Sequence, residues 1–131
     1  MSTRREARER ALLLAYECEQ RSLGLDDVLS ELPVSPDAYA VELLAGLEAH
    51  GHDIDALLRK FSEHWALERM PVIDRALLRL ATYELAHRPE VPTAVAISEA
   101  VELAKEYSTK DSGRFVNGLL SRIAEHVRGE A

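Results

Sequence analysis

Apolar residues recur along the chain at intervals of three and four residues, the spacing that places them on one side of an α-helix. Near the N-terminus this apolar stripe consists of Ala7, Ala11, Leu14, Ala15 and Cys18. Similar stripes follow at Ile73, Ala76, Leu77, Leu80 and Ala81, and at Ile97, Val101 and Ala104. No segment alternates apolar and polar residues for long, as a half-buried strand does. The pattern therefore predicts an all-α protein.

Capping residues, prolines and glycines divide this pattern into seven predicted helices. We place them at residues 3–21, 26–32, 36–51, 54–65, 71–88, 93–107 and 113–128. Ser35 and Pro36 form a typical helix start, because serine caps the first turn and proline fits its first position. Gly51 is the predicted end of that helix, and Asp53 is the predicted cap of the next. The 131 residues correspond to one domain, large enough to bury a core without disulfides.

The stretch DSGRFVNGLL, residues 111–120, contains an Asn-Gly pair, which is a strong signal for a β-hairpin turn. The helical spacing nevertheless continues through the pair, at Val116, Leu120, Ile123 and Val127. A helix contains glycine at a cost of about 1 kcal/mol relative to alanine. We therefore expect Gly118 to be helical and to lie beside Phe115 and Arg122. Either a ligand approaches its bare backbone there, or another segment of the chain packs closely against it.

Cysteine and histidine usage limits the possible chemistry. Cys18 is the only cysteine, so no intrachain disulfide can form, and a reducing, cytoplasmic location is expected. This cysteine lies on an apolar stripe, where a buried and inert thiol is usual. The histidines lack the ligand spacing of a zinc site, no phosphate-binding glycine loop is present, and no apolar run reaches the roughly 20 residues that cross a membrane. We expect no metal, no cofactor, no membrane contact and no enzymatic activity.

The net charge of -7 argues against nucleic acid until its distribution is considered. Residues 1–10 carry four arginines, which we name the arginine arm: Arg4, Arg5, Arg8 and Arg10. Only two glutamates accompany them, so this segment is positive while the rest of the chain is acidic. The arm is either a phosphate-binding segment or a solvated helix start, and the charge pattern leaves both open.

Arg5, Leu12 and Tyr16 are separated by seven and four residues, so they share a helix face that differs from the apolar stripe. A guanidinium and a ring on one exposed face are what single-stranded nucleic acid requires, with the cation on a phosphate and the ring under a base. A tyrosine at this spacing is also common as a packing residue. Arg5 and Tyr16 alone are therefore a weak signal for RNA binding.

Glu84 lies at the centre of the stripe formed by Ile73, Leu77 and Leu80. A buried carboxylate is unfavourable unless it is paired, so Glu84 is expected to have a polar partner. We expect that partner to be the backbone amides at a neighbouring helix start, residues 93–96, rather than a second catalytic group.

The chain contains three further stretches of specific sequence, RREARERALLLAYE, WALERMPVIDRALLRLATYEL and VPTAVAISEAVELAKEYSTKDSGRFVNGLLSRI. In this order they resemble the family of the bacterial transcription antitermination factor NusB. The resemblance covers nearly the whole chain and is weakest over residues 21–64. It implies two packed helical bundles in one compact domain, residues 1–131, with subdomains of about 1–65 and 66–131, and RNA binding without catalysis.

Members of this family bind the boxA element of nascent transcripts together with NusE, a small-subunit ribosomal protein, and join an RNA polymerase complex that suppresses premature termination on ribosomal RNA operons. By resemblance, the RNA-binding positions are the arginine arm, Tyr16 and Phe115, and the helical wheel adds Arg122. The resemblance also implies acidic NusE-binding positions at Glu68, Asp74 and Asp111. Glu6 and Glu9 interrupt the arm, so we expect a shallow salt dependence of RNA binding.

Two other interpretations remain open at this point. The chain could be an RNA-docking module related to those that precede RNA methyltransferase domains, or a helical protein-interaction adaptor without RNA binding. The oligomeric state is also open, because members of the family are monomers or homodimers that cover the RNA surface.

Overall fold

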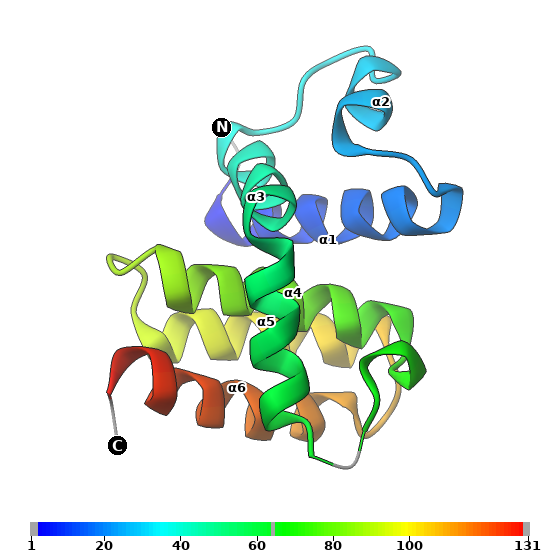
Figure 1. The fold of residues 1–131 in the computed structure, drawn as a ribbon. Helices are drawn as coiled ribbons and strands as arrows, with labels where there is room; N and C mark the ends of the chain where they lie inside the picture. The colour runs from blue at the N-terminus through cyan, green and yellow to red at the C-terminus, as the bar shows by residue number, and fades with distance from the viewer. Residues whose placement is uncertain (1–2, 64, 130–131) are drawn as a thin grey trace.

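The computed structural model describes residues 3–63 and 65–129, and all regular structure in these ranges is helical (Figure 1). The helices are α1 (Arg4–Arg21), α2 (Leu25–Ser30), α3 (Ala38–Phe61), the 3-10 helix η1 (Leu67–Arg69), α4 (Val72–His87), α5 (Thr93–Tyr107) and α6 (Ser112–Arg128). The predicted all-α fold is confirmed. The division into subdomains near residue 65 stays a prediction, and residues 1–2, 64 and 130–131 of the predicted domain lie outside the described ranges.

The main difference from the predicted helices concerns Gly51. A single helix, α3, continues through residues 38–61, so the predicted end at Gly51 and the predicted cap at Asp53 are both wrong. Apolar side chains continue along one side of α3 across the glycine, and Ile54 and Leu58 beyond it are fully buried. Burying two such side chains contributes about 3–6 kcal/mol, which exceeds the roughly 1 kcal/mol cost of a helical glycine.

The start of α3 also differs from the prediction. Asp37, not Ser35, is the N-cap, and its carboxylate accepts a hydrogen bond of 2.8 Å from the backbone N–H of Tyr39. The predicted cap is therefore two residues too early. A carboxylate at this position satisfies a free N–H and interacts favourably with the positive end of the helix dipole.

The long helix α3 crosses α1, α4 and α6, and α4 lies between α1, α3, α5 and α6 (Figure 1). Gly46 permits the close approach of α3 to α4, because a Cβ at this position would lie 2.2 Å from a ring carbon of Tyr83. The central position of α4 explains why it carries several buried polar side chains, among them Asp74 and Glu84. These two carboxylates position the surfaces described below.

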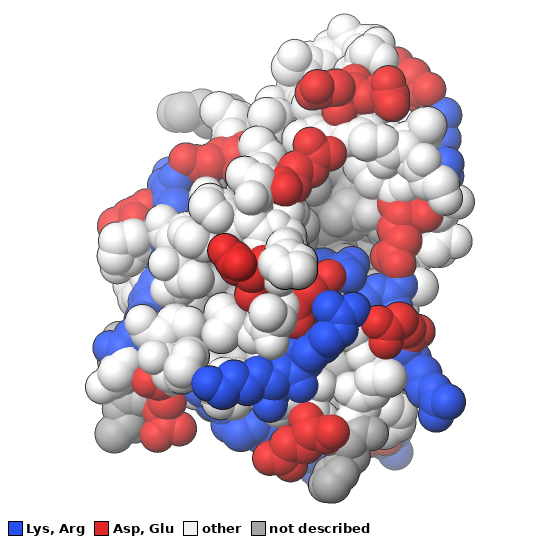
Figure 2. Space-filling view, in the orientation of Figure 1, with Lys and Arg blue, Asp and Glu red and all other residues white. Residues whose placement is uncertain are grey.

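The first and last helices provide the candidate site. α1 begins with a capping box, in which the Thr3 hydroxyl accepts from the Glu6 N–H at 3.1 Å and the Glu6 carboxylate accepts from the Thr3 N–H at 2.9 Å. α6 continues without interruption through the Asn-Gly pair, so the helical prediction for Gly118 is confirmed. Figure 2 shows acidic side chains over α2 and basic ones gathered lower on the same face. The last turn of α3 carries two basic residues, Arg59 and Lys60.

Candidate nucleic-acid interface

The arginine arm lies on the first two turns of α1, and the structure divides it into exposed and buried members. Arg4, Arg5 and Arg10 are exposed, while Arg8 is buried. The guanidinium carbon of Arg4 lies 3.8 Å from the centre of the Tyr39 ring, a cation–π contact that restricts the Arg4 side chain to this edge of α3. Three of the four arginines therefore present charge to solvent.

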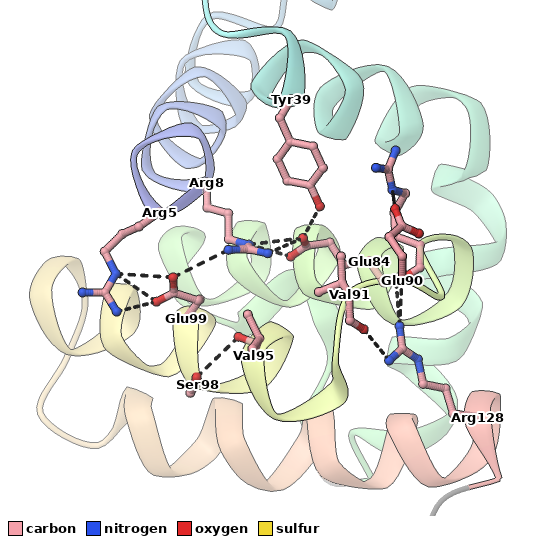
Figure 3. Close-up of polar contacts among 11 residues, drawn as sticks. Arg5, Arg8, Tyr39, Glu84, Glu90, Val91, Val95, Ser98, Glu99 and Arg128 are labelled. Atoms are coloured by element: carbon pink, nitrogen blue, oxygen red, sulfur yellow. Dashed lines mark hydrogen bonds and ion pairs between the residues drawn. The ribbon is translucent and has the colours of Figure 1, made fainter. Parts of the chain in front are cut away.

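The guanidinium of Arg8 points into the protein and binds the buried carboxylate of Glu84 (Figure 3). Its Nε donates to Oε1 at 3.0 Å and its Nη2 donates to Oε2 at 2.9 Å. The Tyr39 hydroxyl donates to the same carboxylate. Burial alone lowers the pKa of Arg8, but the hydrogen bond and charge of Glu84 raise that pKa above its ordinary value, so the arginine stays charged. Arg8 is therefore withdrawn from the exposed part of the arm, contrary to its expected place on the RNA surface.

The predicted burial of Glu84 is confirmed, but the predicted partner is wrong. Side chains from α1 and α3, rather than the backbone amides of residues 93–96, satisfy its carboxylate. Burial and the hydrogen bond to Glu84 raise the pKa of Tyr39, so the phenol remains a proton donor. The buried group thus links α1, α3 and α4 beneath the arginine arm.

Arg5 forms an ion pair with Glu99 of α5 (Figure 3). Its Nη2 lies 2.9 Å and its Nε 3.0 Å from Oε2 of Glu99. The Arg5 side chain is 70% exposed and that of Glu99 only 14% exposed. The hydrogen bond to Glu99 raises the pKa of Arg5. Arg8 also approaches this carboxylate, with Nη1 3.6 Å from Oε1, so Glu99 faces two arginines of the arm.

Tyr16 lies on α1 beyond the arm and is 40% exposed. Leu12, however, is fully buried, so the predicted common face of Arg5, Leu12 and Tyr16 is wrong at its middle position. The reason is that α1 packs against α3, α4 and α5 at once, which buries a wider arc of the helix than one stripe. Arg5 and Tyr16 remain on exposed parts of the same helix.

Residues of α6 form a second, partly exposed surface, which we name the α6 face and define as Phe115, Gly118 and Arg122. Phe115 is half-buried against the core, and its ring meets Trp65 edge to face, with ring centres 6.3 Å apart. Arg122 is exposed and its Nη2 donates to the carbonyl of Phe61 at 3.3 Å. A Cβ on Gly118 would meet one atom within 4 Å among the described residues, Nη1 of Arg122 at 3.7 Å.

The atoms around Gly118 show whether close packing by another segment requires a glycine at this position. Arg122 belongs to the same helix and has a flexible side chain, so no other described segment requires a glycine here. The expected alternative, close packing by another part of the chain, is therefore wrong for residues 3–63 and 65–129. The other alternative, a ligand near the bare backbone, stays a prediction.

Asp74 is not a surface residue, although resemblance assigned it to the partner-binding side. It is 2% exposed and lies in the first turn of α4. Its carboxylate accepts hydrogen bonds from the hydroxyls of Ser108 and Ser112, the second at 2.9 Å. This burial does not fit direct contact with a partner, because the turn between α5 and α6 covers the carboxylate. Its structural role is to fix the start of α6, three residues before Phe115.

The two other acidic positions, Glu68 and Asp111, are exposed. Glu68 lies in η1 and accepts a hydrogen bond of 2.8 Å from Nη2 of Arg59, and this bond lowers the pKa of Glu68. Asp111 is the N-cap position of α6. Asp74, Asp111 and Phe115 line one cavity together with Trp65, so two of the predicted partner-binding positions are adjacent to one of the predicted RNA-binding positions.

Other chemistry is not evident in the part of the chain that the structure describes. Within residues 3–63 and 65–129, no group of three or more His, Cys, Asp or Glu side chains is placed to bind a metal ion. In the same ranges no helix is both long and apolar enough to cross a membrane. Cys18 is half-buried, and burial raises the pKa of its thiol, which favours the unreactive form.

Two exposed aromatic residues near the site were not among the predicted positions. Trp65 is 55% exposed and contacts Phe115. Tyr107 ends α5, and its hydroxyl donates to the Glu9 carboxylate of α1 at 2.6 Å, which raises the pKa of Tyr107 to about 12. Tyr107 therefore joins the end of α5 to α1. The sequence contained one signal for both residues, since each lies directly beside a loop rather than on an apolar stripe.

Comparison with known proteins gives a consistent result. A profile of the NusB family matches residues 5–125. The transcription antitermination protein NusB of Kineococcus radiotolerans is 48% identical over 129 residues, 95% of each chain. The protein of the same name from Salinispora arenicola is 46% identical and covers 97% of this chain and 98% of its own.

Solved structures agree with this result. A structure of T. maritima NusB has a TM-score of 0.85 at 39% identity, covering 95% of this chain and 92% of that one. A chain in the crystal structure of antitermination factors NusB and NusE in complex with dsRNA has a TM-score of 0.80 at 28% identity, covering 94% of this chain and 96% of its own.

Fold and site together define a small all-α domain in which α3 crosses α1, α4 and α6 and exposed arginines begin α1. The matches extend over nearly the full length of both this chain and its relatives. The chain belongs to the NusB family.

Proposed function

We propose that this chain is a non-catalytic, RNA-binding transcription antitermination factor that binds boxA-type RNA together with NusE. The observation that carries the proposal is the near full-length similarity to proteins named transcription antitermination protein NusB, together with the similarity to a chain solved with NusE and dsRNA. In this role the chain acts in the cytoplasm, joins the RNA polymerase antitermination complex and suppresses premature termination on ribosomal RNA operons.

The RNA surface in this proposal extends over α1 and α6. Arg4 and Arg10 contribute positive charge for phosphates, and Tyr16 contributes an exposed ring for a base. Arg5 lies beside them in its ion pair with Glu99. The α6 face contributes a second aromatic ring, a bare backbone and a cation. Arg8 acts indirectly, because its pair with Glu84 fixes α1 against α4.

The NusE surface in this proposal consists of Glu68 and Asp111. Both are exposed acids, so a basic partner can reach them without unfolding the chain. Asp111 also lines the cavity that Asp74 and Phe115 line. Asp74 supports this surface from below through Ser108 and Ser112. The adjacency of the two surfaces explains how RNA and NusE could bind the same chain at once.

The RNA part is tested by titrating labelled boxA RNA with the wild-type chain and with Arg4→Ala/Arg10→Ala, with and without NusE. Each phosphate contact on single-stranded RNA changes the slope of log affinity against log salt by about 0.7, so the double variant is expected to lose up to about 1.4 of slope. Lys60→Ala/Arg69→Ala is the matched control, since it removes two exposed cations outside α1. Equal affinity of wild type and Arg4→Ala/Arg10→Ala would contradict the proposed arm.

The NusE part is tested by charge reversal at the exposed acids. Asp111→Lys and Glu68→Lys are expected to weaken NusE binding about tenfold or more, because like charges opposed across an interface cost several kcal/mol. Glu125→Lys, an exposed acid near the other end of α6, is the control. The readout is the dissociation constant of NusE by calorimetry, and unchanged affinity of both variants would remove these acids from the interface.

A further inference from the structure

The contact between Arg5 and Glu99 is unusual for a residue that is expected to bind RNA. Arg5 is the more exposed residue of this pair, yet its Nε and Nη2 are both directed at the Glu99 carboxylate rather than at solvent. Glu99 is fixed in turn, since its side chain is 14% exposed and lies between Arg5 and Arg8 (Figure 3). The Glu99 carboxylate is thus largely buried, while the Arg5 guanidinium lies at the protein surface.

A carboxylate and a phosphate compete for the same donor geometry. The planar guanidinium offers parallel N–H donors that match two oxygens of either anion. In this structure Nε and Nη2 of Arg5 are both used by Glu99, at 3.0 Å and 2.9 Å from Oε2. A phosphate that binds Arg5 in the same way must first displace the Glu99 carboxylate.

The surrounding charges also oppose an RNA phosphate at Arg5. The cavity beside the pair is lined by Arg5, Arg8 and Lys105 but also by five glutamates, Glu6, Glu9, Glu99, Glu102 and Glu106. Glu102 and Glu106 are exposed and extend from the same helix as Glu99. The arm therefore attracts phosphate less strongly than its count of arginines indicates, and Glu99 is the acid in direct contact with it.

We propose that Glu99 limits the RNA affinity of this chain by occupying the guanidinium of Arg5, so that Arg5 becomes a phosphate contact only when the carboxylate is displaced or neutralised. The inference rests on the proposed RNA-binding function and assigns to α5 an acid that lowers the affinity of the arm on α1. Arg4 and Arg10, which make no contact with Glu99, supply the phosphate attraction in the unmodified chain.

Glu99→Gln tests this inference. The amide keeps the size of the side chain and removes its charge, while Arg8 keeps its two bonds to Glu84. A neutral amide holds the guanidinium less strongly than a carboxylate does, so the variant is expected to bind single-stranded boxA RNA about fivefold more tightly at low salt. The slope of log affinity against log salt is expected to increase by about 0.7, which corresponds to one additional phosphate contact.

Glu106→Gln is the matched control, because it removes the same charge from the same helix and cavity without touching Arg5. It is expected to change the affinity much less and to leave the salt slope unchanged. Arg5→Ala in the Glu99→Gln background is the second control, since it removes the cation that the first substitution releases. The gain in affinity and in salt slope is expected to disappear in that double variant.

Arg5→Ala in the wild-type background gives a measurement that does not depend on the folding of any Glu99 variant. Because Arg5 is occupied, this variant is expected to lose clearly less RNA affinity than Arg10→Ala. An equal or larger loss would overturn the inference, and so would a Glu99→Gln chain that keeps its helical circular dichroism but binds RNA no more tightly. That second result would mean that Glu99 orients Arg5 for RNA instead of competing with it. Absence of RNA binding by the wild type, with or without NusE, would instead overturn the proposed function itself.

Discussion

The two halves of the candidate RNA surface lie over two buried carboxylates of the same helix, and these carboxylates are stabilised in different ways. Glu84 lies beneath the arginine arm and is bound by a guanidinium and a phenol. Asp74 lies beneath the start of α6 and is bound by serine hydroxyls. Both are 2% exposed. Two equally buried carboxylates are therefore stabilised by different partners, one by a positive charge and the other by neutral hydroxyls.

The difference follows from where each carboxylate lies on α4. Asp74 is in the first turn, where the free N–H groups and the helix dipole favour a negative charge, so neutral donors suffice. Glu84 lies in the last turns, where the dipole is unfavourable to an anion, and a full positive charge is needed to offset burial. An arginine from the RNA-binding helix supplies that charge, which couples the position of α1 to the core.

The largest expected effect comes from removing the cation beneath the arm. Arg8→Ala leaves the Glu84 carboxylate buried with only the Tyr39 hydroxyl and is expected to lower the free energy of unfolding by about 3–5 kcal/mol, because one charge of a buried pair becomes unpaired. Urea unfolding followed by circular dichroism measures this change. Arg10→Ala, an exposed arginine of the same arm, is expected to change stability by less than about 0.5 kcal/mol.

A stability loss of similar size in both variants would contradict the distinction between buried and exposed arm residues. A small loss in Arg8→Ala alone would mean that Glu84 is stabilised chiefly by Tyr39. Either outcome would remove the contrast between the two buried carboxylates.

A smaller effect is expected at the other carboxylate. Asp74→Ala leaves neutral hydroxyls, and the Ser112 hydroxyl already lies at hydrogen-bonding distance from that of Ser108, 3.0 Å away, so the two can satisfy each other without the acid. The expected loss of stability is about 1–3 kcal/mol, the usual range for a buried neutral group that loses its partner. A loss larger than that of Arg8→Ala in the same urea experiment would reverse the comparison.

Tyr39→Phe removes the phenolic donor to Glu84 and leaves the ring that Arg4 contacts. Since the Arg8 pair stays intact, the expected loss is about 1–3 kcal/mol, nearer the lower end because the carboxylate keeps its charged partner. Tyr16→Phe, a change at an exposed tyrosine, is the control and is expected to leave the unfolding midpoint unchanged. Equal losses in the two variants would show that the hydroxyl of Tyr39 contributes nothing specific to Glu84.

The helical fold could be predicted from the sequence, because it depends on local spacing. The positions of the RNA and NusE surfaces were inferred from the family resemblance and stay predictions. The stripe through the Asn-Gly pair placed Gly118 in a helix, and the burial of Glu84 followed from its position on a stripe. The partners of Glu84 could not be predicted, since Arg8 and Tyr39 are distant in sequence and reach it only after α1 and α3 pack on α4. The burial of Asp74 could not be predicted for the same reason, since Ser108 and Ser112 reach it only after the helices pack.

The smallest expected effect on stability concerns the outermost part of the α6 face. Gly118→Ala is expected to raise the free energy of unfolding by roughly 0.5–1 kcal/mol, because alanine is the better helix former and the new methyl group would meet only Arg122 at ordinary contact distance. If RNA approaches the bare backbone of α6, the same variant binds boxA RNA more weakly although it is more stable.

Gly51→Ala is the matched control for this last substitution. It also replaces a helical glycine, and no atom of residues 3–63 and 65–129 lies within 4 Å of the new Cβ, but it lies on α3 rather than on the α6 face. It is expected to give a similar gain in stability and no change in RNA affinity. Weaker RNA binding in both variants would attribute the effect to general stiffening of the helices, whereas a loss confined to Gly118→Ala would identify backbone contact as the reason for the glycine.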